Sequence, residues 1–106
     1  MPQFTRAGAE ALIPRVRPLL EDLKRRKGTY DVRPSPPVAK EIEALLREVA
    51  ELGIEVKDLD NGLIDFRAVR GGEAVYLCWR LGEGDRIAWW HTLEGGFAAR
   101  RPLAEN

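Results

Sequence analysis

Residues 62–81 read GLIDFRAVRGGEAVYLCWRL, two segments of alternating character joined by Gly71-Gly72. On both sides of the glycine pair, apolar and polar side chains alternate with a period of two, which is the pattern of half-buried strands. A Gly-Gly dipeptide between two such segments is a strong signal for a tight β-hairpin turn. This stretch therefore predicts an antiparallel hairpin with strands at about residues 63–69 and 74–81.

Two further turns extend this hairpin into a meander. Asn61-Gly62 predicts a preceding strand at about 54–59, and the loop at residues 82–85 predicts a following strand at about 86–91. Because tight turns fix the strand register, opposing residues can be paired in advance. The predicted pairs are Leu59–Ile64, Asp58–Asp65, Ile64–Trp79, Asp65–Cys78, Phe66–Leu77 and Ala68–Val75.

This register gives the sheet an apolar face and a polar face. The apolar face collects Leu59, Ile64, Phe66, Ala68, Val75, Leu77, Trp79 and Leu81. The polar face collects Asp58, Asp65, Arg67, Tyr76, Cys78 and Arg80. The facing of the fourth strand stays open. Pairing of Leu81 with Arg86 places Trp90 on the apolar face and His91 on the polar face, whereas a bulged register reverses both.

The first half of the chain predicts two helices that cover the apolar face. In the first helix, Thr5 is the expected N-cap and Gly28 the expected end, with the cations of residues 24–27 in the last turn, where they complement the helix dipole. Pro14 and Pro18 each remove a backbone donor from this helix, so we expect it to be kinked.

The second helix follows a proline-rich connector. Ser35 is its expected N-cap, Pro36 its first helical residue and Gly53 its C-terminal cap. Its apolar residues recur at helical spacing and are Val38, Ile42, Leu45, Leu46, Val49 and Leu52.

The predicted architecture is α+β, a kinked two-helix hairpin packed on a four-stranded antiparallel β-meander. The sequence predicts a single domain over residues 1–106, in which residues 1–53 form the helical hairpin and residues 54–92 the sheet. Residues 93–106 are predicted to form a tail that contains Gly and Arg and covers the sheet as an extended strand.

Composition excludes several classes of protein. The 106 residues hold 17 basic and 17 acidic side chains, one Cys and one His. Zero net charge argues against electrostatic capture of nucleic acid, and a single Cys excludes an intramolecular disulfide. No apolar run has the length of a membrane span, so we expect a cytoplasmic protein. Few amides and an excess of Arg over Lys fit a heat-adapted source or, equally, high-GC coding.

Several blocks of the sequence resemble a known family. These blocks are Gly62–Phe66, Val75–Glu83, Ile87, Trp90-His91, Gly96-Phe97 and Arg101-Pro102, together with Phe4-Thr5 and Leu12–Pro14. They are similar to the uncharacterised bacterial family called domain of unknown function 2203, over nearly the whole chain. The most specific block is LCWRLGE, residues 77–83. The resemblance implies no reaction, substrate or cofactor. It implies only that the family's function, whatever it is, depends on the matched residues.

The polar face holds the residue types of a small catalytic or metal site. His91, Asp65 and Glu83 are the candidate catalytic residues, as acid–base groups or as metal ligands. The predicted register also brings Asp65 beside Cys78. However, no His-x-x-x-His or Cys-x-x-Cys spacing is present, so a hydrogen-bonded polar face without metal or cofactor is the favoured interpretation. For Asp58 and Asp65, structural ion pairing with arginine is favoured over a catalytic carboxylate pair.

Tryptophan and arginine concentrate in the last third of the chain. The candidate binding residues are Trp79, Arg80, Trp89, Trp90, Phe97 and Arg101. This combination is typical of interface hot spots and of stacking platforms. Plain packing within the fold is an equal alternative for these aromatic residues. The leading hypothesis is therefore a non-catalytic binding or interaction module that self-associates as a homodimer and takes a protein or small-molecule partner. The alternative is a small enzyme or metal-dependent site that uses His91, Asp65 and Glu83.

Overall fold

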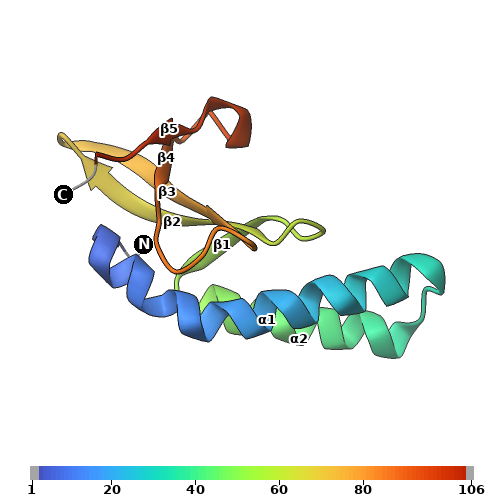
Figure 1. The fold of residues 1–106 in the computed structure, drawn as a ribbon. Coiled ribbons are helices and arrows are strands. Elements are labelled where there is room, and N and C mark those ends of the chain that lie inside the picture. Colours follow the sequence, from blue (N-terminus) through green and yellow to red (C-terminus); the bar gives the residue numbers. More distant parts are fainter. Residues whose placement is uncertain (1–2, 105–106) are drawn as a thin grey trace.

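The computed structural model describes residues 3–104 as two helices packed on one face of a five-stranded antiparallel sheet (Figure 1). The elements are α1 (Arg6–Val32), α2 (Pro36–Glu51), β1 (Ile54–Asp58), β2 (Leu63–Arg70), β3 (Glu73–Arg80), β4 (Trp89–Thr92), the short 3₁₀ helix η1 (Phe97–Ala99) and β5 (Arg101–Pro102). The strands lie in chain order across the sheet. The predicted α+β class, helical pair and antiparallel meander are confirmed, and β5 adds a fifth strand.

Helix α1 is longer than the sequence predicted. Thr5 caps it as expected, since its hydroxyl accepts the backbone N–H of Gly8 at 3.0 Å. The helix then runs through Pro14 and Pro18, both exposed, and its first turns are inclined to the remainder (Figure 1). It also runs through Gly28, so the end predicted there is wrong.

The residues after Gly28 explain this extension. Lys27 pairs with Asp31 one turn later at 2.9 Å, and Tyr30 packs against the core. These contacts offset the cost of about 1 kcal/mol that glycine carries inside a helix. The cations of residues 24–27 therefore lie within the helix rather than in its last turn.

Helix α2 begins and ends close to the predicted residues. The Ser35 hydroxyl accepts the backbone N–H of Val38 at 3.4 Å, and Pro36 is the first helical residue. Leu52 is the C-cap, and Gly53 follows with a left-handed φ of 85°. Across residues 3–104, neither helix has the length and apolar composition that crossing a bilayer requires.

The core lies between the helices and the apolar face of the sheet. Trp79 is its largest fully buried side chain, and the indole N–H donates to the carbonyl of Gly84 at 3.1 Å. The other fully buried members are Ala9, Ile13, Val16, Leu20, Leu23, Val49, Ile64, Phe66 and Ile87. Phe4 extends the core, because its ring meets Phe66 edge-on with the centroids 5.3 Å apart.

The β2–β3 register agrees with the prediction. Ile64 faces Trp79, Asp65 faces Cys78, Phe66 faces Leu77 and Ala68 faces Val75. The glycine pair closes the hairpin with both residues at positive φ, a conformation that glycine adopts without a steric penalty.

The β1–β2 register differs from the prediction. Glu55, not Asp58, faces Asp65, and Val56, not Leu59, faces Ile64. The strand is irregular between Val56 and Asp58, and it ends at Asp58 because that carboxylate accepts the N–H of Asp60 at 3.1 Å and the Asn61 side-chain amide at 2.7 Å. The predicted pairs Leu59–Ile64 and Asp58–Asp65 are therefore wrong.

Strand β4 takes the unbulged register. Trp90 faces Leu77 on the apolar face, and His91 faces Tyr76 on the polar face. The strand begins at Trp89 instead of residue 86, because the preceding loop is held to α1: the N–H of Ile87 donates to the Glu10 carboxylate at 2.7 Å.

Candidate functional site

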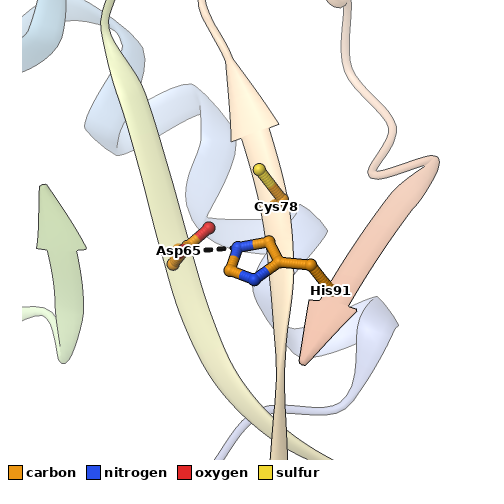
Figure 2. Close-up of side chains that lie close together, drawn as sticks. All are labelled: Asp65, Cys78 and His91. Carbon is orange, nitrogen blue, oxygen red and sulfur yellow. Dashed lines mark hydrogen bonds and ion pairs between the residues drawn. The ribbon is translucent and has the colours of Figure 1, made fainter. Parts of the chain in front are cut away.

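Three polar side chains converge on the face of the sheet that points away from the helices. Asp65 of β2 and His91 of β4 point toward each other, and Cys78 of β3 lies beside them (Figure 2). Their exposed fractions are 1%, 0% and 3%. One donor atom from each, a carboxylate oxygen, the thiol sulfur and a ring nitrogen, lies within 4.8 Å of the other two. These three residues form what we call the polar cluster.

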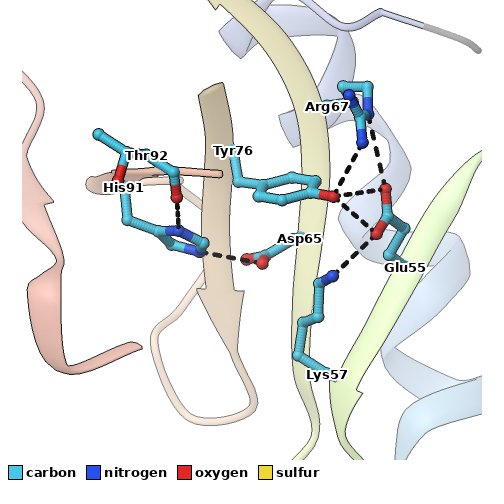
Figure 3. Close-up of polar contacts among 7 residues, drawn as sticks. All are labelled: Glu55, Lys57, Asp65, Arg67, Tyr76, His91 and Thr92. Atoms are coloured by element: carbon cyan, nitrogen blue, oxygen red, sulfur yellow. Dashed lines mark hydrogen bonds and ion pairs between the residues drawn. The ribbon is translucent and has the colours of Figure 1, made fainter. Parts of the chain in front are cut away.

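Hydrogen bonds fix the protons of the His91 ring. Nδ1 lies 2.7 Å from the carbonyl oxygen of Thr92, and Nε2 lies 2.9 Å from Oδ2 of Asp65 (Figure 3). A carbonyl oxygen only accepts, so Nδ1 carries a hydrogen and donates it. Nε2 and the carboxylate then hold one proton between them, on the ring or on the acid. In both cases the pair is electrically neutral overall.

Burial dominates the protonation of the other groups in the polar cluster. It raises the pKa of Asp65 above its ordinary value, and the facing His91 offsets only part of this effect. Burial and the adjacent Asp65 charge raise the pKa of Cys78 to about 12, so the thiol stays protonated at neutral pH. Among residues 3–104, Oδ1 of Asp65 has no hydrogen-bond partner although it is buried.

The segment after β4 covers the polar cluster and leaves a cavity beside it. The cavity has a volume of about 150 Å³ and is lined by Lys57, Leu63, Asp65, Tyr76, His91, Leu93, Glu94, Gly96 and Phe97. The predicted extended tail is only partly extended, because η1 stands between this cover and the short strand β5. Asp65 and His91 therefore lie at the wall of a small cavity of mixed polar and apolar lining.

A second polar network adjoins the cavity (Figure 3). Glu55 accepts hydrogen bonds from the Tyr76 hydroxyl and the Lys57 ammonium, both at 2.9 Å, and Arg67 donates to the Tyr76 oxygen at 3.1 Å. Burial opposes ionisation of Glu55, but these two donors outweigh it and hold the pKa of that carboxyl below its ordinary value. The sequence prediction missed Glu55 because it placed a two-residue turn at Asn61-Gly62. In the structure β1 already ends at Asp58 and β2 begins at Leu63, and the irregularity in β1 shifts the register by one more residue, so Glu55 faces Asp65.

Of the three predicted catalytic residues, the structure brings two together. His91 and Asp65 are in contact, whereas Glu83 accepts the Arg80 backbone N–H at 2.9 Å and the Arg100 guanidinium at 2.8 Å. Glu83 is thus held in the β3–β4 loop, and Cys78 is the third member of the polar cluster.

The predicted binding residues divide between the two faces of the sheet. Trp79 is fully buried against the helices, and Trp90 is partly buried on the same face. On the polar face, Phe97 lies between two guanidiniums, with Arg80 at 5.4 Å and Arg100 at 4.7 Å from the ring centroid.

The arginine contacts of Trp89 and Trp90 are likewise divided between the two faces of the sheet. Arg100 also covers the Trp89 ring at 4.8 Å, whereas Arg70 and Arg101 cover Trp90 at 4.6 and 5.6 Å. The tryptophans therefore do not form one common surface.

One family model matches most of this chain. The model of a family described as uncharacterized conserved protein (DUF2203) matches residues 24–103, a range that includes the whole polar cluster. The chain belongs to the DUF2203 family. The match begins within α1, so the resemblance at Phe4-Thr5 and Leu12–Pro14 lies outside it. No curated protein and no solved structure matches the chain.

In this DUF2203 protein, the polar cluster has two chemical capacities. A buried acid and imidazole that share a proton can accept or give up that proton. A carboxylate oxygen, a sulfur and an imidazole nitrogen that converge on one point are also the donor types of transition-metal sites. Both capacities depend on Asp65 and His91 sharing a sheet face, which the structure shows.

Proposed function

We propose that this protein is a small binding module whose ligand site is the cavity beneath residues 93–97. Asp65 and His91 form the wall of the site. The observation that supports this proposal is the placement of a buried ionisable pair beside a cavity, on the face of the sheet away from the hydrophobic core.

The position of the pair favours a functional role over a structural one. Removing ionisable groups from water is costly, and well-packed apolar residues in their place are often neutral or stabilising. The core is already complete on the opposite face of the sheet. Natural sequences keep costly buried groups of this kind mainly at functional sites.

The cavity limits the class of ligand. Pockets for drug-sized molecules occupy about 300–1,000 Å³, whereas this cavity has about 150 Å³. Its lining combines apolar residues with residues that carry charged or polar groups, which are Lys57, Asp65, Tyr76, His91 and Glu94. The ligand class that fits is a small polar molecule or an ion.

Replacement of the pair by apolar residues tests whether it serves function or stability. We expect Asp65→Val and His91→Leu each to destabilise the protein, because each leaves one buried polar partner unpaired. The double variant should be as stable as the natural protein or more so. A double variant that is as unstable as the weaker single variant would contradict the proposal. The control is the exposed Lys27–Asp31 pair, whose replacement by two alanines should change stability by less than about 1 kcal/mol.

Ligand binding is tested by nuclear magnetic resonance with acetate, phosphate and imidazole as probes. Binding at the cavity should shift the amide signals of residues 65, 76, 91 and 93–97, and the double variant should lose these shifts. If none of the three probes shifts these signals at millimolar concentration, the proposal is wrong.

The homodimer expected from the sequence stays a prediction. In the structure, Ile42 and Val49 of α2 are buried against the core of the same chain, whereas the other apolar residues of this helix, Val38, Leu45, Leu46 and Leu52, are only partly buried. Sedimentation at micromolar concentration checks it, and a clean monomer would contradict it. The cytoplasmic location and the heat-adapted source also stay predictions.

A further inference from the structure

The three donor atoms of the polar cluster are spaced almost as a metal ion would space them. Zinc holds nitrogen and oxygen ligands at about 2.0–2.2 Å and sulfur at about 2.3 Å, which puts tetrahedral ligand atoms roughly 3.3–3.8 Å apart. The donor atoms here lie within 4.8 Å of one another, and the closest pair is 2.9 Å apart. A shift of about 1 Å per side chain would produce the zinc spacing.

The His91 ring is already oriented as a metal ligand. Ligating histidines almost always donate the other ring N–H to a carbonyl or carboxylate, which fixes the tautomer. Nδ1 of His91 donates to the carbonyl of Thr92, so Nε2 presents its lone pair to Asp65 and Cys78 when the shared proton leaves.

The buried Asp65 carboxylate has an unused acceptor. Its Oδ1 atom has no hydrogen-bond partner within the described residues, which is unfavourable for a buried acceptor. A cation within the polar cluster would satisfy this oxygen as well as the sulfur and Nε2.

The charges of the polar cluster balance those of a dication. With the carboxylate and the thiolate ionised and the imidazole neutral, a divalent ion makes the total charge of these buried groups zero. In the metal-free protein, the polar cluster holds two displaceable protons, one on the Cys78 sulfur and one between Asp65 and His91. Binding forms one bond each from the metal to sulfur, nitrogen and oxygen and releases both protons to solvent.

We propose that the polar cluster binds a divalent transition-metal ion, with Zn²⁺ the best match, through Asp65, Cys78 and His91. The proposal rests on the proposed function and names its ligand. Three protein ligands leave a fourth position, which water from the adjoining cavity would fill. The absence of paired ligand spacing in the sequence does not oppose this site, because each ligand comes from a different strand.

Cobalt(II) is the probe for this proposal. Tetrahedral Co²⁺ absorbs in the visible range, and a thiolate ligand adds a charge-transfer band in the near ultraviolet. The chain has one Cys and one His, so a thiolate band can arise only from Cys78. We expect one Co²⁺ per chain, both absorption features, displacement by Zn²⁺ and release of two protons per metal ion.

Variants decide between this site and other carboxylates of the chain. Cys78→Ala should abolish the thiolate band, and Asp65→Asn and His91→Gln should each weaken Co²⁺ binding at least 100-fold. Asp85→Asn, which changes an exposed carboxylate, should leave binding unchanged. Circular dichroism verifies that each variant is folded.

A folded protein that gives no thiolate band with excess Co²⁺ would overturn the metal proposal. Binding that survives Asp65→Asn and His91→Gln would also overturn it. The proposed function is judged separately: if the apolar double variant is stable and acetate or phosphate shifts the cavity signals, the binding module stands without the metal. If the double variant is unstable, no probe shifts those signals and excess Co²⁺ gives no thiolate band, both proposals fail.

Discussion

Nε2 of His91 lies 2.9 Å from Oδ2 of Asp65, although the two residues belong to strands that are not neighbours in the sheet. Strand β3 separates them, and the imidazole crosses it between Tyr76, its direct partner, and Cys78, the partner of Asp65. This contact therefore ties β2 to β4 across the strand between them. It also determines how much stability is lost when either residue is replaced.

The first prediction contrasts two substitutions in this pair. His91→Ala leaves the Asp65 carboxyl buried without its partner, and loss of one member of a buried pair typically costs about 3–5 kcal/mol. Asp65→Asn should cost much less, because an amide N–H can donate to Nε2 of the same tautomer. Urea unfolding of both variants without added metal measures the difference. Equal costs would show that the shared proton is not what holds the pair together.

The second prediction concerns the thiol of Cys78. Its pKa of about 12 and full burial predict that it stays protonated and unreactive in the folded protein. With Ellman's reagent at pH 8, labelling should be slow in the native protein and complete within seconds in denaturant. Labelling of the folded protein requires transient unfolding that exposes the buried thiol. The native rate should therefore rise in destabilised variants such as His91→Ala. Fast labelling of the native protein would contradict both the burial and the raised pKa.

The β2–β3 hairpin could be predicted from the sequence in full because local chemistry determines it. Gly71-Gly72 permits the positive φ that a two-residue hairpin turn requires at both positions, and alternating side chains then fix which residues face the core. The facing of His91 needed a choice between two registers, and the structure takes the unbulged one. The juxtaposition of Asp65 and His91 follows from these two registers together.

The parts that could not be predicted depend on side-chain hydrogen bonds in the turns. Strand β1 ends at Asp58, where the carboxylate accepts backbone N–H groups of the following turn, so Glu55 and not Asp58 lies opposite Asp65. This contact is local, but Asn61-Gly62 also fits the two-residue turn that the sequence predicted. Glu83 lies outside the polar cluster because it binds Arg100, seventeen positions later, a contact that no local sequence pattern indicates.

The third prediction is a dependence of stability on acid pH. Hydrogen bonds from Lys57 and Tyr76 lower the folded-state pKa of Glu55 below 4.5. The folded state then favours the carboxylate, so the stabilisation is fully present above pH 4.5 and is lost as pH falls through the folded-state pKa. Glu55→Gln should be less stable at pH 7 and should lose less stability on acidification. Urea midpoints from pH 7 to pH 3 test this, and parallel curves would contradict it.

The fourth prediction compares two glycines in turns. Gly62 and Gly71 both have positive φ, 63° and 57°, so alanine is strained at either position. A Cβ at Gly62 would also lie 2.5 Å from Cδ1 of Leu81, whereas a Cβ at Gly71 meets nothing within 4 Å. Gly71→Ala should cost about 1 kcal/mol and Gly62→Ala about 2–3 kcal/mol. If the two variants unfold at the same denaturant concentration, Leu81 moves aside at no cost.

The fifth prediction concerns stability with and without metal. A ligand that binds only the folded state adds RT ln(1 + [L]/Kd), which is about 2.7 kcal/mol at one hundred times Kd. Zn²⁺ should therefore raise the thermal midpoint of the natural protein, and a chelator should return it to the metal-free value. The effect should weaken as pH falls, because protons compete for the sulfur of Cys78 and for the His91–Asp65 pair. The Asp65→Val, His91→Leu double variant is the control and should show no shift, since only Cys78 remains as a ligand. An equal rise in that variant would mean that zinc binds elsewhere on the chain.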